Sequence, residues 1–169
     1  NGLRRIMIAE IATNCLDKFE VIKNTSVVNN EFITHRLSLV LIKEPSKKKE
    51  AVSLIAKCTT NDPLNIYAKD ITGVEVQNKE TLILKLHKGE EINITMSISS
   101  GIGKLHSRWS PVTAIEYNSE KGIFFLGIES TGVLSPEEIF KRAIDKLIEK
   151  LDTLDQAIEN KNTTKIIID

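Results

Sequence analysis

The chain is poor in the residues that mark a secreted, metal-binding or membrane-spanning protein. It has two cysteines in 169 residues, Cys15 and Cys58, and no CxxC pair. Two thiols cannot complete a structural zinc site by themselves, so buried reduced cysteines are expected, although a disulfide between them stays open. No apolar run approaches the ~20 residues of a membrane-spanning helix, and no secretory leader opens the sequence. These absences predict no contact with a membrane.

The chain also lacks an excess of charge of either sign. Its 23 lysine and arginine residues balance 23 aspartate and glutamate residues. Domains that bind nucleic acid directly usually carry a basic excess, so tight DNA binding by this chain alone is not expected. Hydrophobic residues make up 41% of the sequence, which is enough for a folded core in one domain of ordinary size or two small ones.

The N-terminal part of the chain predicts two helices with a strand between them. Apolar residues at helical spacing predict the first helix over residues 1–11, and a run of β-forming residues predicts a strand over 16–22. An asparagine cap at Asn29 or Asn30 predicts the start of a second helix that continues to Val40. The apolar stripes contain Leu3, Ile6, Met7 and Ile11 in the first helix and Phe32, Ile33, Leu37 and Val40 in the second.

A polar, lysine-rich segment over residues 43–50 follows, and it predicts a surface loop at a domain border. After it, apolar and polar residues alternate with a period of two. This alternation predicts an antiparallel β module with one buried face. The expected strands cover residues 52–57, 82–87, 92–98, 112–117 and 123–129, with a turn at 118–122 between the last two.

The C-terminal helix has the clearest local signal. Ser135 can cap it, Pro136 occupies the first helical position, and Glu138 completes a capping box. Apolar residues then recur at alternating steps of four and three, which is the spacing of a helix packed along a partner helix. The sequence leaves open whether that partner lies in this chain or in another. The stripe contains Phe140, Ile144, Leu147, Leu151, Leu154 and Ile158.

Residues with possible catalytic chemistry are few and scattered. The sequence has no HExxH or GxSxG motif. A composite pocket of His35, His106 and Cys58, in a small metal- or cysteine-dependent enzyme, is the alternative function that stays open.

The segment GIGKLHSRWSPV at residues 101–112 is a second candidate site. Its basic residues Lys104, His106 and Arg108 alternate with other side chains, which predicts an ordered edge segment. Trp109, beside an arginine, fits either an anchor at a protein interface or a core residue of the β module. A phosphate loop is not favoured because GxxxxGK[ST] is missing.

These segments, in this order, resemble the alpha-like assembly subunit of multisubunit RNA polymerases. The similarity lies in NGLRRIMIAEIATNCLD at the start, HRLSL at 35–39, GIGKLHSRWSP at 101–111 and ESTGVLSPEE at 129–138. It covers nearly the whole chain and is nearest to the third-largest subunit of RNA polymerase II, with the archaeal alpha-like subunit and the bacterial alpha N-terminal domain more distant. Ala12, Ser38, Leu41, Leu105 and Ser107 depart from the family pattern.

The resemblance implies an α+β fold in two modules. Residues 1–42 and 122–160 would form a discontinuous dimerisation module, residues 43–121 an inserted antiparallel β domain, and 161–169 a tail. It also implies a further strand before Asn1. The implied function is a non-catalytic assembly subunit that pairs with a smaller homologous subunit and forms a platform for the two large catalytic subunits.

The resemblance further implies the contacts of this subunit. The expected dimer interface contains Leu3, Ile6, Met7, Phe32, Leu37, Phe140, Ile144, Leu147, Leu151, Leu154 and Ile158. The expected docking residues for the second-largest, β-like subunit, the largest subunit and a small zinc-bearing subunit are Arg4, Arg5, Lys104, His106, Arg108 and Trp109. No cofactor is expected in this chain, because magnesium would lie in the large subunits, and DNA or RNA would be reached only through the complex. The expected location is the nucleus or, for a virus-encoded chain, the viral particle or host cell.

Overall fold

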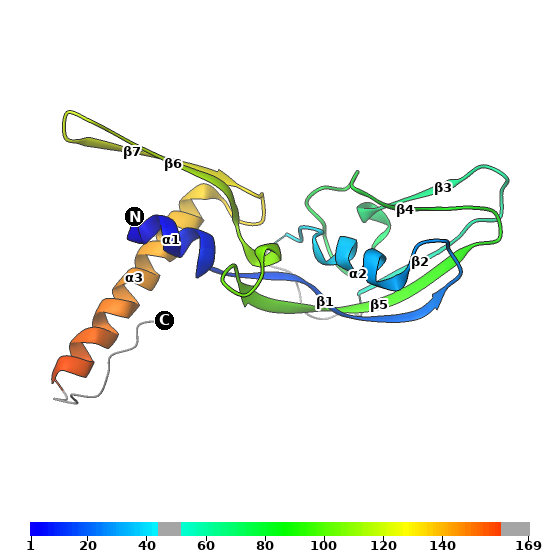
Figure 1. Cartoon of the computed structure of the whole chain (residues 1–169), viewed down its shortest axis with the longest axis horizontal. Helices are drawn as coiled ribbons and strands as arrows, with labels where there is room; N and C mark the ends of the chain where they lie inside the picture. The colour runs from blue at the N-terminus through cyan, green and yellow to red at the C-terminus, as the bar shows by residue number, and fades with distance from the viewer. Residues whose placement is uncertain (44–51, 160–169) are drawn as a thin grey trace. The chain divides into compact units, whose positions relative to one another are not determined.

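The computed structural model describes residues 1–43 and 52–159. The chain divides into two compact units. Figure 1 shows the chain coloured by residue number. We call Ala12–Gly101 the central unit and Asn1–Ile11 with Ile102–Asp169 the terminal unit. No helix in the described ranges has the length and hydropathy needed to cross a membrane.

The central unit is built on a three-stranded sheet with the strand order β1-β5-β2, formed by Ala12–Asn24, Glu91–Ile102 and Val52–Lys57. Strands β2 and β5 are antiparallel, with Leu54 opposite Ile94. Side chains of both strands alternate between buried and more exposed positions, so one face of the sheet lies on the core, as the period of two predicts. A second, two-stranded antiparallel sheet pairs β3 (Leu64–Tyr67) with β4 (Leu82–Leu86), and a short 3-10 helix, η1 (Ala68–Asp70), follows β3.

Helix α2 (Asn30–Ser38) closes the core of the central unit, and it begins where the sequence predicts. The side chain of Asn29 caps the helix, because its Oδ1 accepts a hydrogen bond of 3.1 Å from the backbone N–H of Phe32. Ile33 and Leu37 are fully buried in the hydrophobic core, together with Leu16 of β1. The helix therefore packs on the strand that precedes it.

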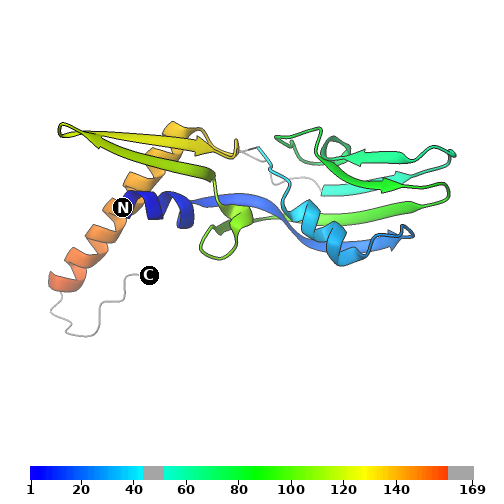
Figure 2. The same ribbon diagram turned by 45° about the horizontal axis from the view of Figure 1, so that its top comes forward.

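The terminal unit combines two helices with a hairpin. Helix α1 (Gly2–Ala9) packs on helix α3 (Pro136–Glu159), as Figure 2 shows. Strands β6 (Val112–Glu120) and β7 (Ile123–Ser130) form an antiparallel hairpin. Its turn contains Lys121 and Gly122, both with positive φ angles (49° and 80°), as the tight turns that join twisted strands require.

The predicted cap of α3 is present in part. Ser135 Oγ accepts a hydrogen bond of 3.2 Å from the backbone N–H of Glu138. The Glu138 carboxylate instead pairs with Arg142 Nε at 2.8 Å, and this hydrogen bond lowers the pKa of Glu138. The serine half of the capping box thus satisfies one of the free N–H groups of the first turn.

Replacing Ser135 by alanine is expected to lower the free energy of unfolding by about 1 kcal/mol, because the N–H of Glu138 loses its acceptor. Urea unfolding followed by circular dichroism would measure this. Ser119→Ala, at an exposed position of the hairpin in the same unit, is the matched control and should leave the midpoint unchanged. Equal losses in both variants would contradict a capping role.

The structure confirms the α+β class and the predicted helices and strands. It differs from the sequence analysis in an additional strand, in the conformation of residues 104–109 and, thirdly, in the bounds of the compact units. Strand β3 was not predicted. Residues 104–109, predicted as an ordered edge segment, are not in a strand: a turn leads into a second 3-10 helix, η2 (Ser107–Trp109). The predicted lysine-rich loop and the tail at 161–169 lie almost wholly outside the described residues.

The third difference concerns the domain bounds. The compact units do not coincide with the predicted modules, 1–42 with 122–160 and 43–121. Strand β1 pairs with β5, and α2 packs on β1, so residues 12–42 belong to the central unit. The hairpin in turn brings residues 112–121 into the terminal unit. Which residues act in dimerisation stays a prediction.

Candidate protein-protein interface

One side of α3 is already covered within the terminal unit. Ile139 and Ala143 of α3 are fully buried, and Ile6 and Met7 of α1 are buried to 4% and 0% exposure. Farther along α3, Lys150 Nζ lies 2.7 Å from Glu10 Oε2, in an ion pair whose two side chains are about four-fifths buried (21% and 19% exposed). The sequence therefore encodes an intrachain helix pair.

A different side of α3 is left uncovered. Five large apolar side chains there are between 36% and 61% exposed. Successive residues of a helix are rotated by about 100°, so positions separated by three, four or seven residues share one side. Leu147 and Leu154, which lie between the uncovered and the covered sides, are half-buried. We call this surface the α3 apolar face; it contains Phe140, Ile144, Ile148, Leu151 and Ile158.

The glycine-rich segment is fixed to the end of α1. The backbone N–H of Lys104 donates a hydrogen bond of 2.8 Å to the carbonyl of Ala9. A Cβ atom on Gly103 would lie 2.2 Å from the carbonyl oxygen of Ile8, so only glycine permits this approach. The side chain of Lys104 is exposed, and so are those of Arg4 and Arg5 in the first turns of the same helix. The terminal unit thus presents cations near both ends of α1.

The sequence of this chain matches the RNA polymerase Rpb3/Rpb11 dimerisation domain over residues 1–151. The chain belongs to this family. It is 32% identical to the DNA-directed RNA polymerase subunit Rpo3 of Methanocaldococcus jannaschii, over 94% of this chain and 84% of the archaeal chain. It is 25% identical to subunit RPB3 of RNA polymerase II of Schizosaccharomyces pombe, over 98% and 82% of the two chains. It matches 54% of subunit 3 of RNA polymerases II, IV and V of Arabidopsis thaliana, at 29% identity.

Family membership confirms the resemblance drawn from the sequence. The chain is an alpha-like assembly subunit of a DNA-directed RNA polymerase, a subunit type without catalytic activity of its own. The family places it within the intracellular transcription machinery and implies a dimerisation partner. The alternative of a metal- or cysteine-dependent enzyme gains no support.

The structure sorts the eleven residues predicted at the dimer interface. Leu37 is a core residue of the central unit, and Ile6 and Met7 are covered within the terminal unit, so these three offer no free surface in this structure. Phe32 is 52% exposed but lies on the central unit. The remaining members lie on the terminal unit, exposed or half-buried: Leu3, Phe140, Ile144, Leu147, Leu151, Leu154 and Ile158. Ile148 is an exposed member of the α3 apolar face. It was not in the predicted set because it does not follow the alternating spacing of four and three residues.

The predicted docking residues also differ in their exposure to solvent. Trp109 is 8% exposed, so it is not an exposed anchor in this structure, and it lies in the terminal unit rather than in the hydrophobic core of the central unit. The guanidinium carbon of Arg108 lies 4.2 Å from the centre of the Trp109 ring, and His106 meets the same ring edge-on at 6.5 Å. His106 Nδ1 accepts a hydrogen bond of 3.1 Å from the backbone N–H of Arg108, so this histidine caps η2. Exposed charge thus remains mainly at Arg4, Arg5 and Lys104.

The residues of the composite pocket show no sign of a metal or catalytic site within the part of the chain that the structure describes. Cys58 is 1% exposed, and its Sγ lies 3.5 Å from the carbonyl oxygen of Asp62. His35 is exposed on α2 of the central unit, whereas His106 belongs to the terminal unit. Among the residues that the structure describes, no three histidine, cysteine, aspartate or glutamate side chains are grouped to hold a metal ion.

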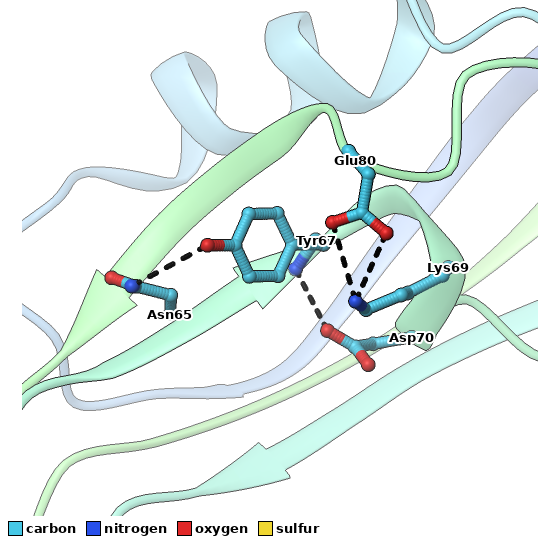
Figure 3. Close-up of polar contacts among 5 residues, drawn as sticks. All are labelled: Asn65, Tyr67, Lys69, Asp70 and Glu80. Carbon is cyan, nitrogen blue, oxygen red and sulfur yellow. Dashed lines mark hydrogen bonds and ion pairs between the residues drawn. The ribbon is translucent and has the colours of Figure 1, made fainter.

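A polar cluster beside η1 has a structural explanation, as Figure 3 shows. Asp70 Oδ2 accepts a hydrogen bond of 2.7 Å from the backbone N–H of Tyr67, and Lys69 Nζ lies 3.2 Å from Glu80 Oε1. The ammonium group of Lys69 also lies over the Tyr67 ring, 4.9 Å from its centre, and Asn65 reaches the Tyr67 hydroxyl at 3.5 Å. These contacts hold the turn after β3 and leave no set of converging free groups.

Proposed function

We propose that this chain is the larger alpha-like member of a heterodimer and that its smaller homologue covers the α3 apolar face. The exposure of that face is the observation that carries the proposal. Its five side chains face solvent although the neighbouring side of the same helix is covered by α1. Burying a large aliphatic or aromatic side chain contributes roughly 1.5–3 kcal/mol, so covering all five supplies a strong driving force for association.

The character of the face fits a permanent partner better than a transient one. Obligate interfaces bury on the order of 2,000 Å² or more and are largely apolar. A face this apolar along a single helix is expected to pair with a similar helix, so that the two helices of each subunit form a four-helix interface. Membership of a family defined by a dimerisation domain supports pairing with a partner subunit.

The dimer would then serve as a platform for polymerase assembly. We expect the exposed Arg4 and Arg5 to meet carboxylates of the second-largest, β-like subunit, because arginine forms forked hydrogen bonds to such groups. Lys104, in the glycine-rich segment, would help to seat a large subunit or the small zinc-bearing subunit as a point charge. The largest subunit and a small zinc-bearing subunit are the other expected partners. Magnesium and nucleotidyl transfer would belong to the large subunits, with no cofactor in this chain. The chain would act in the nucleus or, if a virus encodes it, in the viral particle or host cell.

Co-expression with the smaller alpha-like subunit of the same genome tests this function. The two chains should sediment together as a 1:1 complex in analytical ultracentrifugation. Because the contact is apolar, the complex should persist at about 1 M salt, where the Debye length is only ~3 Å and charge-dependent contacts weaken. Separate sedimentation of the two chains at micromolar concentration would overturn the proposal.

A further inference from the structure

A groove lies on the central unit between α2 and the segment that leads into β4. Its volume is about 420 Å³, within the range of pockets that enclose a small molecule or a few side chains. All of its lining residues belong to the central unit. They are Phe32, His35, Arg36, Leu39, Val40, Leu41, Asn78, Thr81 and Ile83.

The rim of the groove is apolar and exposed, and its floor is apolar and buried. Phe32 and Leu39 are 52% and 45% exposed, whereas Val40 and Ile83 are 6% and 3% exposed. Phe32 and Leu39 therefore lie at the opening of the groove, and the buried Val40 and Ile83 at its floor are part of the hydrophobic core. This arrangement can take up an apolar side chain from outside at little conformational cost.

The groove also contains an incompletely paired cation. Arg36 Nη2 donates a hydrogen bond of 2.5 Å to the carbonyl of Leu82. Its Nε is buried and has no acceptor among the described residues. The guanidinium carbon lies 5.7 Å from the centre of the Phe32 ring, so the charge lies beside the apolar rim. A guanidinium has five N–H donors and stays charged at any physiological pH, so one carbonyl leaves most of its capacity unused.

The charges around the groove have one sign. The lining contains Arg36 and the exposed His35, and it contains no aspartate or glutamate. A carboxylate is the group that best matches a guanidinium, because two parallel N–H···O bonds can form. The neighbouring rim favours a bulky apolar side chain next to that carboxylate.

We propose that this groove docks a peptide segment of another protein chain, with an acidic group beside a bulky apolar side chain. The segment would pair its carboxylate with Arg36 and place its apolar side chain between Phe32 and Leu39. A nucleic-acid strand fits less well, because the mouth is apolar and only two basic side chains line it. This second contact surface lies on the central unit and does not depend on the α3 apolar face. Phe32, which the resemblance placed at the dimer interface, also lines this groove.

Hydroxyl-radical footprinting of the wild-type chain, free and within its assembled polymerase, tests occupancy of the groove. Oxidation of Phe32 and Leu39 should fall in the complex to the rate of Leu37, which is fully buried on the same helix. Unchanged oxidation of both residues would overturn the proposal. Leu151 reports the dimer contact in the same spectra, so the two proposals can fail separately.

Carbodiimide cross-linking of the complex tests the chemistry of the occupant. Arg36→Lys places an amine in the groove that this reagent joins to a nearby carboxylate, and the wild type, which has no amine there, is the control. The proposal predicts a bond to an acidic residue of another chain that has a bulky apolar neighbour in its sequence. A bond to an acidic residue of this same chain, or a nuclease-sensitive adduct, would overturn it.

Discussion

Leu151→Asp is expected to abolish association with the smaller homologous subunit. Leu151 lies within the α3 apolar face and is 55% exposed in the isolated chain. In the dimer it would be desolvated, and an aspartate there would be an unpaired buried charge. Such a charge costs on the order of 3–5 kcal/mol, which weakens binding by about 10²- to 10³-fold or more.

The isolated variant should nevertheless fold like the wild type. An exposed position away from special contacts tolerates substitution with a change of about 0.5 kcal/mol or less in the free energy of unfolding. Loss of binding with unchanged thermal unfolding would therefore locate the defect at the interface. The affinity can be measured by isothermal titration calorimetry and the folding by circular dichroism.

Gln156→Asp is the matched control for this experiment. It adds the same charge to α3 at an exposed position that is rotated by about 140° from Leu151. Binding by this control should stay close to that of the wild type. If Leu151→Asp bound with wild-type affinity, the α3 apolar face would not be the dimer interface.

The sequence predicts α3 well because its signals are local. Ser135, Pro136 and the spacing of the apolar residues lie in one continuous segment, and the structure confirms the start of the helix. What the spacing could not decide was which apolar residues α1 covers. Ile139 and Ala143 are fully buried, and Phe140 and Ile144, one position further along, remain exposed. That choice depends on a contact between segments more than a hundred residues apart.

The same limit explains the position of α2. Its boundaries follow from the Asn29 cap and a local apolar stripe. The family resemblance implied its place in the dimerisation module, and in the structure Ile33 and Leu37 are buried with β-strand residues of the central unit. An apolar stripe predicts that a face of the helix is covered, and it does not say which element covers it.

The groove beside Arg36 had no sequence signal, because residues from positions 32–41 and 78–83 line it jointly.

Trp109 illustrates an ambiguity that only packing resolves. Its place beside Arg108 fits an exposed anchor as well as a core residue of the β module, whereas the structure buries it to 8% exposure in the terminal unit, with the Arg108 guanidinium carbon 4.2 Å from its ring centre. The ordered edge segment predicted over 104–109 is a turn and a 3-10 helix for a related reason. Alternation over six residues also arises in a turn followed by a 3-10 helix, where the backbone N–H of Ser110 bonds to the carbonyl of Ser107.

Gly103→Ala is expected to destabilise the terminal unit. The added Cβ would lie 2.2 Å from the carbonyl oxygen of Ile8 and 3.3 Å from its carbonyl carbon, and both are backbone atoms of α1. A backbone carbonyl in a helix cannot swing aside as a flexible side chain can, so the loop must move away from the helix. The hydrogen bond of 2.8 Å from Lys104 N–H to the carbonyl of Ala9 would be lengthened or lost.

The expected loss is about 1–3 kcal/mol in the free energy of unfolding, which for a chain of this size lowers the melting temperature by roughly 2–4 °C per kcal/mol. Gly2→Ala is the matched control, because a Cβ there meets no atom within 4 Å and alanine favours the helix that Gly2 begins. Faster hydrogen exchange at the Lys104 amide in Gly103→Ala, but not in Gly2→Ala, would locate the damage at the contact between loop and helix. A melting temperature equal to that of the wild type would show that the loop can shift freely, and Lys104 would then have no fixed position relative to Arg4 and Arg5.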